Sequence, residues 1–178
     1  MIARSTFANF GVLESIRVQN HCSNVSMSMS TSRSSVESAG TSAVTRTMAN
    51  DTRLRPARQD DADKIADLEI LLFPDNCWNE HTLADLLQQG KSWVAEENGE
   101  ILGYAVISDD NGIDDLLRLG VRAKSRRQGI GRCLMELGLG HRPAVLMVKA
   151  MNPAIALYRQ CGFRVVGTLD GAWTMRRP

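Results

Sequence analysis

Residues 121–131 place a basic, glycine-punctuated loop between a predicted strand and a predicted helix, with the sequence Val-Arg-Ala-Lys-Ser-Arg-Arg-Gln-Gly-Ile-Gly. A helix N-terminus presents unpaired backbone N–H groups and a partial positive charge, so the oxygens of a diphosphate can bind there. Gly129 and Gly131 allow the backbone to approach a ligand closely, and the arginine and lysine side chains add positive charge. The segment therefore predicts a strand, a diphosphate-binding loop and a helix, in that order.

Two common nucleotide-binding motifs do not match this loop. It lacks the GxxxxGK[ST] pattern of a P-loop, and it lacks GxGxxG with a downstream acid, the dinucleotide-binding pattern. Coenzyme A carries a diphosphate and a 3'-phosphate, which suit the basic side chains. A solvated turn between strand and helix is the alternative.

Strand-like and helix-like segments alternate after residue 51, which is typical of an α/β domain. Asp60 and Asp61 can cap a helix that Pro74 ends. The pairs Asn98-Gly99 and Asn111-Gly112 tolerate positive φ and predict two hairpin turns. The apolar residues at helical spacing in the first helix are Ile65, Leu68, Leu71 and Leu72. The predicted strands cover 54–58, 93–96, 101–107, 114–121, 145–148 and a terminal pair, and the later helices cover 81–89, 130–139 and 153–161.

The chain divides near residue 50. Residues 23–47 are rich in serine and threonine and contain one acid, Glu37. Such a segment buries too little apolar surface to offset its ordering entropy. We therefore expect a disordered leader over residues 1–50 and one folded domain over residues 53–178. We favour Met48 as the true start, and an organelle-targeting peptide is the alternative.

Composition restricts the partners. The chain has 21 basic and 20 acidic residues, so no overall field attracts nucleic acid or an anionic membrane. The cysteines are widely spaced, without a CxxC pair or a histidine at metal-ligand spacing, which favours reduced thiols and no metal site. No apolar run reaches the roughly 20 residues that a bilayer crossing needs. We expect a soluble, cytoplasmic protein.

Two motifs resemble those of the GNAT superfamily of N-acetyltransferases. Arg126-x-x-Gly129-x-Gly131 matches the family's pyrophosphate loop, Arg/Gln-x-x-Gly-x-Gly/Ala. Residues 152–163 resemble the family's helix motif, which starts with Asn and ends in Leu-Tyr-x-x-x-Gly-Phe. The two motifs stand in the family's order, and the resemblance covers residues 53–178.

The resemblance implies an α/β (α+β) fold, with a mixed, mostly antiparallel sheet splayed between its fourth and fifth strands and about four flanking helices. Acetyl-CoA would be the co-substrate, and its pantetheine arm would enter the gap between those strands. A primary amine would attack the thioester directly, without a metal. The implied acetyl-CoA-binding residues are Leu119, Val121, Arg126, Arg127, Gln128, Gly129, Ile130, Gly131 and Asn152.

Tyr158 matches the family's tyrosine that protonates the departing thiolate, which is a general-acid role. Packing of an amphipathic helix on the sheet is the alternative for Tyr158. Asn152 would also be expected as a structural cap of the helix that follows Pro153. Both uses of Asn152 are compatible.

The general base is a separate question. The RimI-type alanine N-acetyltransferases of this family use a glutamate on the fifth strand, and Met147 stands at that position here. In the histone-acetyltransferase branch the base lies on the fourth strand, at the position of Asp115, which we predict as the base. Strand alternation puts Asp114 and Asp115 on opposite faces, and solvation of both is the alternative. The substitutes for Asp115 are Asp114, Glu96 and His81.

Two features bear on the acceptor amine. Phe73 and Trp78 match the linker that borders the peptide site in RimI-type enzymes, so we predict that they bind a protein N-terminus, with helix packing as the alternative. The tight hairpin after Gly167 lacks the long tyrosine-bearing loop of those enzymes, which leaves a small-molecule amine open. A catalytically silent acetyl-CoA sensor or interaction module is the alternative function, and Met147 favours it weakly.

Overall fold

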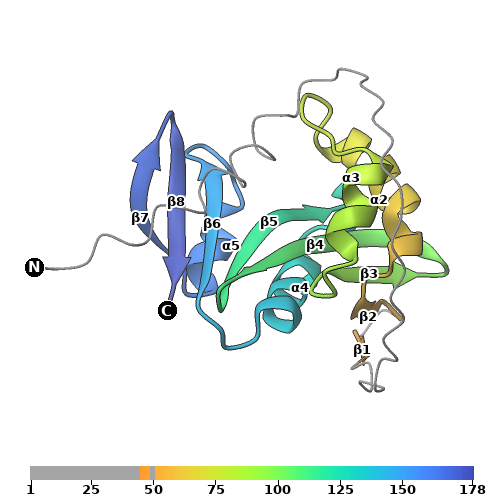
Figure 1. Ribbon diagram of the computed structural model, residues 1–178. Helices are drawn as coiled ribbons and strands as arrows, with labels where there is room; N and C mark the ends of the chain where they lie inside the picture. The colour runs from red at the N-terminus through yellow and green to blue at the C-terminus, as the bar shows by residue number, and fades with distance from the viewer. Residues whose placement is uncertain (1–44, 49–50) are drawn as a thin grey trace, which may run out of the picture.

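The structure, a computed structural model, describes residues 45–48 and 51–178 (Figure 1). Eight strands form one sheet: β1 Arg46–Thr47, β2 Arg53–Pro56, β3 Trp93–Glu97, β4 Glu100–Asp110, β5 Ile113–Val121, β6 Ala144–Lys149, β7 Arg164–Leu169 and β8 Ala172–Arg177. The described α-helices are α2 Ala62–Leu72, α3 Glu80–Leu87, α4 Ile130–Leu139 and α5 Ile155–Gln160, with the 3-10 turns η1 Gln59–Asp61 and η2 Ala123–Ser125. None of these helices is long and apolar enough to span a bilayer.

The predicted leader lies outside the described residues, apart from positions 45–48. Within those positions Arg46 and Thr47 form β1, which pairs with β2 through Leu54 and Arg53. Met48 follows β1 and packs against the core cluster beside α4.

The sheet is mixed and its strand order is β1-β2-β3-β4-β5-β6-β8-β7. All neighbouring strands are antiparallel except β5 and β6, which are parallel. These two strands pair only where Asp114 and Asp115 meet Ala144 and Val145. Beyond that point they diverge, and Figure 1 shows β6, β8 and β7 turned away from the rest of the sheet. This confirms the predicted mixed, mostly antiparallel sheet with about four helices.

Two apolar layers cover the faces of the sheet. Helices α2 and α3 pack on one face, and α4 and α5 on the other (Figure 1). Strand β4 serves both layers, because Tyr104 and Val106 point into the α2–α3 cluster while Ala105 and Ile107 point into the α4–α5 cluster. A strand buried on both faces is continuously apolar, as the sequence from Ile101 shows.

The first long helix differs from its prediction in one residue. Ile65 and Leu68 are buried as expected, but Leu71 is 68% exposed. Instead of Leu71, the charged residue Glu69 continues the buried face of α2, and it is fully buried. The helix ends at Leu72, two residues before the proline that was predicted to end it.

The hairpin turns are confirmed. Asn98 and Gly99 join β3 to β4 with φ of 51° and 81°. Asn111 and Gly112 join β4 to β5 with φ of 51° and 89°. The conformation with two consecutive positive φ values matches the twist of the flanking strands, which explains why an Asn-Gly pair stands at each turn.

Candidate active site

The loop between β5 and α4 contains two residues in the left-handed backbone region. Arg127 has φ of 65° and Gly129 has φ of 83°. A positive φ is uncommon for a residue other than glycine, and such conformations gather at functional sites. Where the backbone alternates between right-handed and left-handed conformations, successive N–H groups can point into one concavity that binds anions. Residues 126–129 are exposed, so a ligand can reach this loop.

Helix α4 begins directly after this loop, and no described side chain caps its N-terminus. Its first regular hydrogen bond runs from Cys133 N to Gly129 O over 3.0 Å. The N–H groups of Ile130, Gly131 and Arg132 therefore point out of the helix end. The Ile130 side chain is 2% exposed and anchors this end in the core. The open helix end and the loop fit a diphosphate, and the basic side chains add to this fit.

Gly131 lies where β5, α4 and α5 meet. A Cβ atom on Gly131 would stand 3.3 Å from Leu157 Cδ2, 3.6 Å from Val121 Cγ2 and 3.9 Å from Leu119 Cδ2. Leu119 and Val121 belong to the part of β5 that no longer pairs with β6. The fold thus brings the predicted acetyl-CoA-binding residues Leu119, Val121 and Gly131 together with α5, at Leu157, the residue before Tyr158.

Other side chains predicted at this site make local contacts. Arg126 Nε donates to Val121 O over 3.0 Å, so this strand carbonyl already has a partner at the loop. Gln128 Nε2 donates to Lys124 O over 3.4 Å. Asn152 Oδ1 accepts from Ala154 N over 2.8 Å, which fixes a turn ahead of α5. Helix α5 therefore starts at Ile155 and not at residue 153 as predicted.

Tyr158 is buried in the core cluster shared by α4, α5 and β6, and it is 8% exposed. Its ring meets Phe163 edge-on, with 6.3 Å between the ring centroids. Burial, with a smaller contribution from Cys161, raises the pKa of Tyr158 to about 12. The hydroxyl therefore keeps its proton at neutral pH, as a group that protonates a thiolate must. Core packing and a general-acid role are both compatible with this position.

Asp114 and Asp115 are 0% and 2% exposed, so the alternative that both are solvated is wrong. Asp114 Oδ1 accepts from Lys91 Nζ over 2.6 Å and lies 3.2 Å from Arg142 Nε. Leu116 packs in the α4–α5 cluster, so the preceding Asp115 lies on the opposite face, which α2 and α3 cover. Strand alternation therefore separates the two carboxylates, as predicted.

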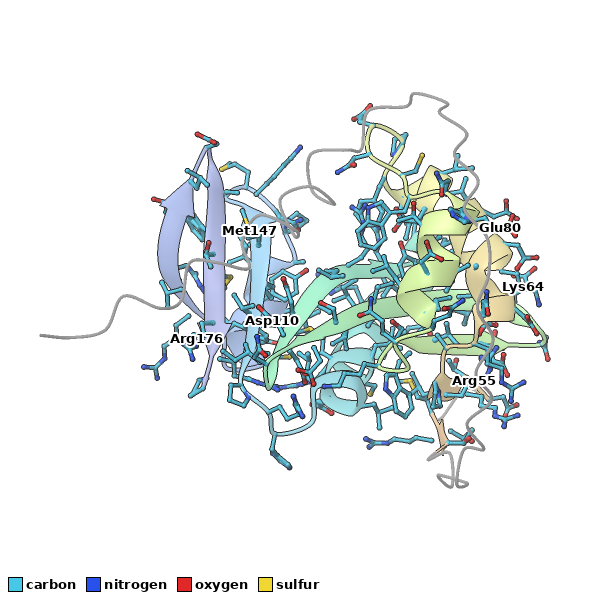
Figure 2. All side chains as sticks on the ribbon, in the orientation of Figure 1. Arg55, Lys64, Glu80, Asp110, Met147 and Arg176 are labelled. Carbon is cyan, nitrogen blue, oxygen red and sulfur yellow. The ribbon has the colours of Figure 1, made fainter. Side chains whose placement is uncertain are left out.

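The remaining positions considered for the base lie elsewhere. Glu96 stands on β3, two strands from β5, and accepts from Arg55 Nη2 over 2.7 Å. The side chain of His81 is 91% exposed on α3, 3.8 Å from Asp85. Met147 lies on β6, as Figure 2 shows.

Phe73 and Trp78 lie on either side of Arg118. The Arg118 Cζ atom is 4.5 Å from the centroid of the Phe73 ring and 4.3 Å from that of Trp78. Trp78 is 6% exposed, so its indole packs in the protein, which was the alternative for these aromatics. Phe73 is half-buried and keeps part of its ring accessible.

Sequence reasoning missed a buried polar cluster beneath these rings. Glu69 accepts hydrogen bonds from the Tyr104 hydroxyl and from Trp78 N, the latter over 3.0 Å, and lies 3.2 Å from Arg118 Nε. Burial raises the pKa of Glu69, and Arg118 and the two hydrogen bonds offset only part of this effect. One signal was available, because Glu69 stands four residues after Ile65 on the apolar face of a helix.

Residues 88–165 match the family model of the acetyltransferase (GNAT) domain. An N-alpha-acetyltransferase from Sulfurisphaera tokodaii is 30% identical over 139 residues, which are 66% of this chain and 83% of that protein. The peptidyl-lysine N-acetyltransferase YiaC from Escherichia coli is 33% identical over 89 residues. That match spans 49% of this chain and 57% of YiaC.

Solved structures agree with these matches. The ribosomal-protein-S18-alanine N-acetyltransferase from Escherichia coli has a TM-score of 0.62 and 26% identity, over 71% of this chain and 93% of that one. Naa50 from Arabidopsis thaliana, in complex with the bisubstrate analogue CoA-Ac-MVNAL, shares the fold with a TM-score of 0.63 and 22% identity, over 71% of this chain and 98% of that one. With its splayed sheet and open α4 N-terminus, this chain belongs to the GNAT family of N-acetyltransferases, which use acetyl-CoA as co-substrate.

Proposed function

We propose that this protein transfers the acetyl group of acetyl-CoA to the α-amine of a protein N-terminus, by direct attack in a complex that holds both substrates. The main support is that Leu119, Val121 and Gly131 lie next to one another and to Leu157 of α5. They do so beyond the point where β5 stops pairing with β6. This arrangement surrounds one gap with a diphosphate-binding loop, an unpaired strand edge and the helix that carries Tyr158.

Acetyl-CoA would be held mainly by backbone groups. The N–H groups around Gly129 and at the start of α4 would receive the diphosphate, with positive charge from Arg126 and Arg127. On its β6 side, β5 has no described partner strand after Asp115. Its backbone groups there can hydrogen-bond the amides of the pantetheine arm, as an added strand would.

The transfer needs one base and one acid. The acceptor nitrogen bonds to the thioester carbon, and we assign Asp115 to take the proton that this nitrogen loses. The carbon–sulfur bond of the tetrahedral intermediate then breaks, and Tyr158 gives its proton to the departing sulfur. The products are the N-acetylated amine and the free thiol of CoA, and solvent restores both side chains to their starting states.

An α-amine suits this site better than a lysine side chain. An α-amine has a pKa of about 7.7–8.0 and is partly neutral at neutral pH, whereas lysine, at about 10.4, requires more help from a base. The 30% identity to an N-alpha-acetyltransferase over 83% of that protein supports the same acceptor class. The tight hairpin between β7 and β8, which turns at Asp170 and Gly171, favours a second candidate, a small-molecule amine.

The test measures thiol release from acetyl-CoA by the full chain, with N-terminal peptides, lysine peptides, polyamines, amino acids and aminoglycosides as acceptors. We expect turnover with N-terminal peptides, and we expect Tyr158→Phe to lower kcat by about 10²–10⁴-fold while acetyl-CoA affinity is retained. Release with small amines only would support the second candidate. Tight acetyl-CoA binding without thiol release from any acceptor would instead support a silent sensor.

A further inference from the structure

We propose that Arg118 positions the linker between α2 and α3, residues 73–79, as the acceptor-side wall of the site and thereby sets the affinity for the acceptor. Arg118 lies on β5, three residues after Asp115 and directly before Leu119. The inference rests on the proposed function in one respect, because it takes the acceptor to be a protein N-terminus, whose site Phe73 and Trp78 of this linker were predicted to border.

Arg118 holds the linker through several contacts at once. Its guanidinium lies between the rings of Phe73 and Trp78, with Cζ 4.5 Å and 4.3 Å from their centroids. Its Nη2 atom donates to Asn76 O over 2.9 Å. The two ends and the middle of the linker are therefore attached to one strand residue. Residues 73–79 form neither a helix nor a strand, so side-chain contacts such as these contribute to fixing the path of the linker.

Glu69 anchors the guanidinium from below. Its fully buried carboxylate lies 3.2 Å from Arg118 Nε and also accepts from the backbone N–H of Trp78 over 3.0 Å. The Tyr104 hydroxyl donates to the same carboxylate. Gly120 makes room for this tyrosine, since a Cβ atom on Gly120 would stand 2.6 Å from Tyr104 Cε1. The cluster thus fixes both the arginine and the linker that it holds.

This placement gives Arg118 an influence on the acceptor that is separate from cofactor binding. Leu119, one of the predicted acetyl-CoA-binding residues, packs on the α4–α5 side of the sheet, whereas its neighbour Arg118 faces the α2–α3 side, where Phe73 and Trp78 lie. A wall that is no longer held in place makes fewer contacts with a bound acceptor and misaligns the attacking amine, and a misplacement of about 1 Å can cost about 10²-fold in rate. Loosening the linker should therefore weaken the acceptor complex and leave the diphosphate loop unchanged.

Lysine cannot replace Arg118 here. Arginine has a planar group that stacks between two rings while its separate N–H groups reach a carboxylate and a carbonyl. A lysine ammonium is a point charge that keeps the attraction to Glu69 but loses the double stacking. Arg118→Lys therefore separates the positioning role from simple charge neutralisation.

The experiment compares Arg118→Lys with Arg55→Lys. Arg55 is a matched control, since its side chain is 12% exposed against 13% for Arg118 and is likewise ion-paired, to Asp61 and Glu96. We expect Arg118→Lys to raise the KM for the acceptor about tenfold or more, with the KM for acetyl-CoA unchanged. Arg55→Lys should leave both KM values near those of the parent chain.

Hydrogen exchange provides a readout that does not depend on any acceptor. The amide of Trp78 donates to Glu69, so we expect peptides covering residues 73–79 to exchange faster in Arg118→Lys and not in Arg55→Lys. Unchanged exchange of the linker, or an unchanged acceptor KM in an active Arg118→Lys protein, would overturn the inference. Absence of any acceptor for the parent chain would refute the proposed function, while the exchange result would still decide whether Arg118 holds the linker.

Discussion

The protonation state of Tyr158 decides how the reaction depends on alkaline pH. Burial, with a smaller effect of Cys161, raises the pKa of Tyr158 to about 12, and in the proposed mechanism this residue acts in its protonated form. We therefore expect kcat/KM to rise as the acceptor amine loses its proton, near pH 7.7–8.0 for an α-amine, and then to stay level to about pH 10. A pH–rate profile tests this expectation. A decline with a midpoint at or below about pH 10, the ordinary value for tyrosine, would mean that the hydroxyl ionises normally and is not the buried acid described above.

The two neighbouring aspartates offer a direct test of the base. Asp115→Asn keeps the size of the side chain and removes its ability to take a proton, so kcat/KM should fall by about 10²–10⁴-fold at neutral pH. Asp114→Asn is the matched control, because Asp114 pairs with Lys91 and Arg142 on the opposite face. It should lower thermal stability and leave the activity of the folded fraction within a few-fold. Equal losses of activity in both variants would count against Asp115 as the base.

At the level of single residues, sequence reasoning selected candidate site residues that stand in motifs and missed polar residues that do not. Gly129, Gly131 and Tyr158 stand in spacings that can be identified along the chain. Glu69 and Arg118 are 49 positions apart in the sequence and meet only in the fold. A charge on the apolar face of a helix and a charge inside an apolar strand each indicate a buried partner, but neither indicates which residue that partner is.

Among the elements, the loop before α4 is where we expect glycine to matter most for acetyl-CoA binding. Gly129 has φ of 83°, and its added Cβ would meet only Met48 Cε, at 3.7 Å. Alanine in this conformation is strained by about 1–2 kcal/mol, so the loop would tend to leave it. We expect Gly129→Ala to weaken acetyl-CoA binding about tenfold, as measured by calorimetry.

Gly90 provides the control for this substitution. It has φ of 76° with nothing within 4 Å of an added Cβ, and it lies in the turn after α3. Gly90→Ala carries the same backbone strain and should lower stability without changing acetyl-CoA affinity. If Gly129→Ala bound acetyl-CoA as tightly as Gly90→Ala does, the left-handed conformation of the loop would not be needed for the ligand.

The predicted elements were most accurate where local chemistry decides the structure. The Asn-Gly pairs fixed two hairpins, and α4 runs over the predicted residues 130–139 because a glycine precedes it and another follows it. The start of α5 was wrong by two residues, since the Asn152 side chain and Pro153 form a turn of their own. How far β5 and β6 pair depends on contacts between segments that are distant in the sequence. The splay between these strands was therefore predicted only from the resemblance to a family.

At the scale of the whole molecule, two ion clusters tie distant segments together. Lys91 Nζ lies 2.6 Å from both Asp109 and Asp114, so it joins the turn after α3 to β4 and β5 where the sheet begins to splay. At the other end of the domain, Arg55 joins β2 to η1 and β3 through Asp61 and Glu96. Ion pairs thus reinforce the core packing at the point where β5 and β6 begin to diverge and at the β2 end of the sheet.

The Arg55 cluster makes the stability of the domain depend on pH. Burial alone would raise the pKa of Asp61, but hydrogen bonds from the Arg55 side chain and the Arg58 backbone together outweigh burial and lower it. A carboxyl with a lowered folded-state pKa contributes stability above its unfolded value, 3.8, and this contribution is lost as the pH falls through the folded-state pKa. The stabilisation should therefore be complete at pH 5 to 7 and decline below pH 4.

Asp61→Asn tests this dependence, because asparagine cannot carry the charge. We expect the free energy of unfolding, from urea titrations, to be lower in the variant by about 1.5–3 kcal/mol at pH 7, the usual range for hydrogen bonds to a charged group. The difference from the parent chain should be the same at pH 5 and shrink at pH 3, which lies below the unfolded-state pKa of 3.8, so that the unfolded parent chain binds a proton at this carboxyl. Asp60→Asn, at the exposed neighbouring position, should show no such difference at any of these pH values. A difference that stayed constant down to pH 3 would mean that shape and hydrogen bonding at this position, and not the charge of Asp61, hold η1 against the sheet.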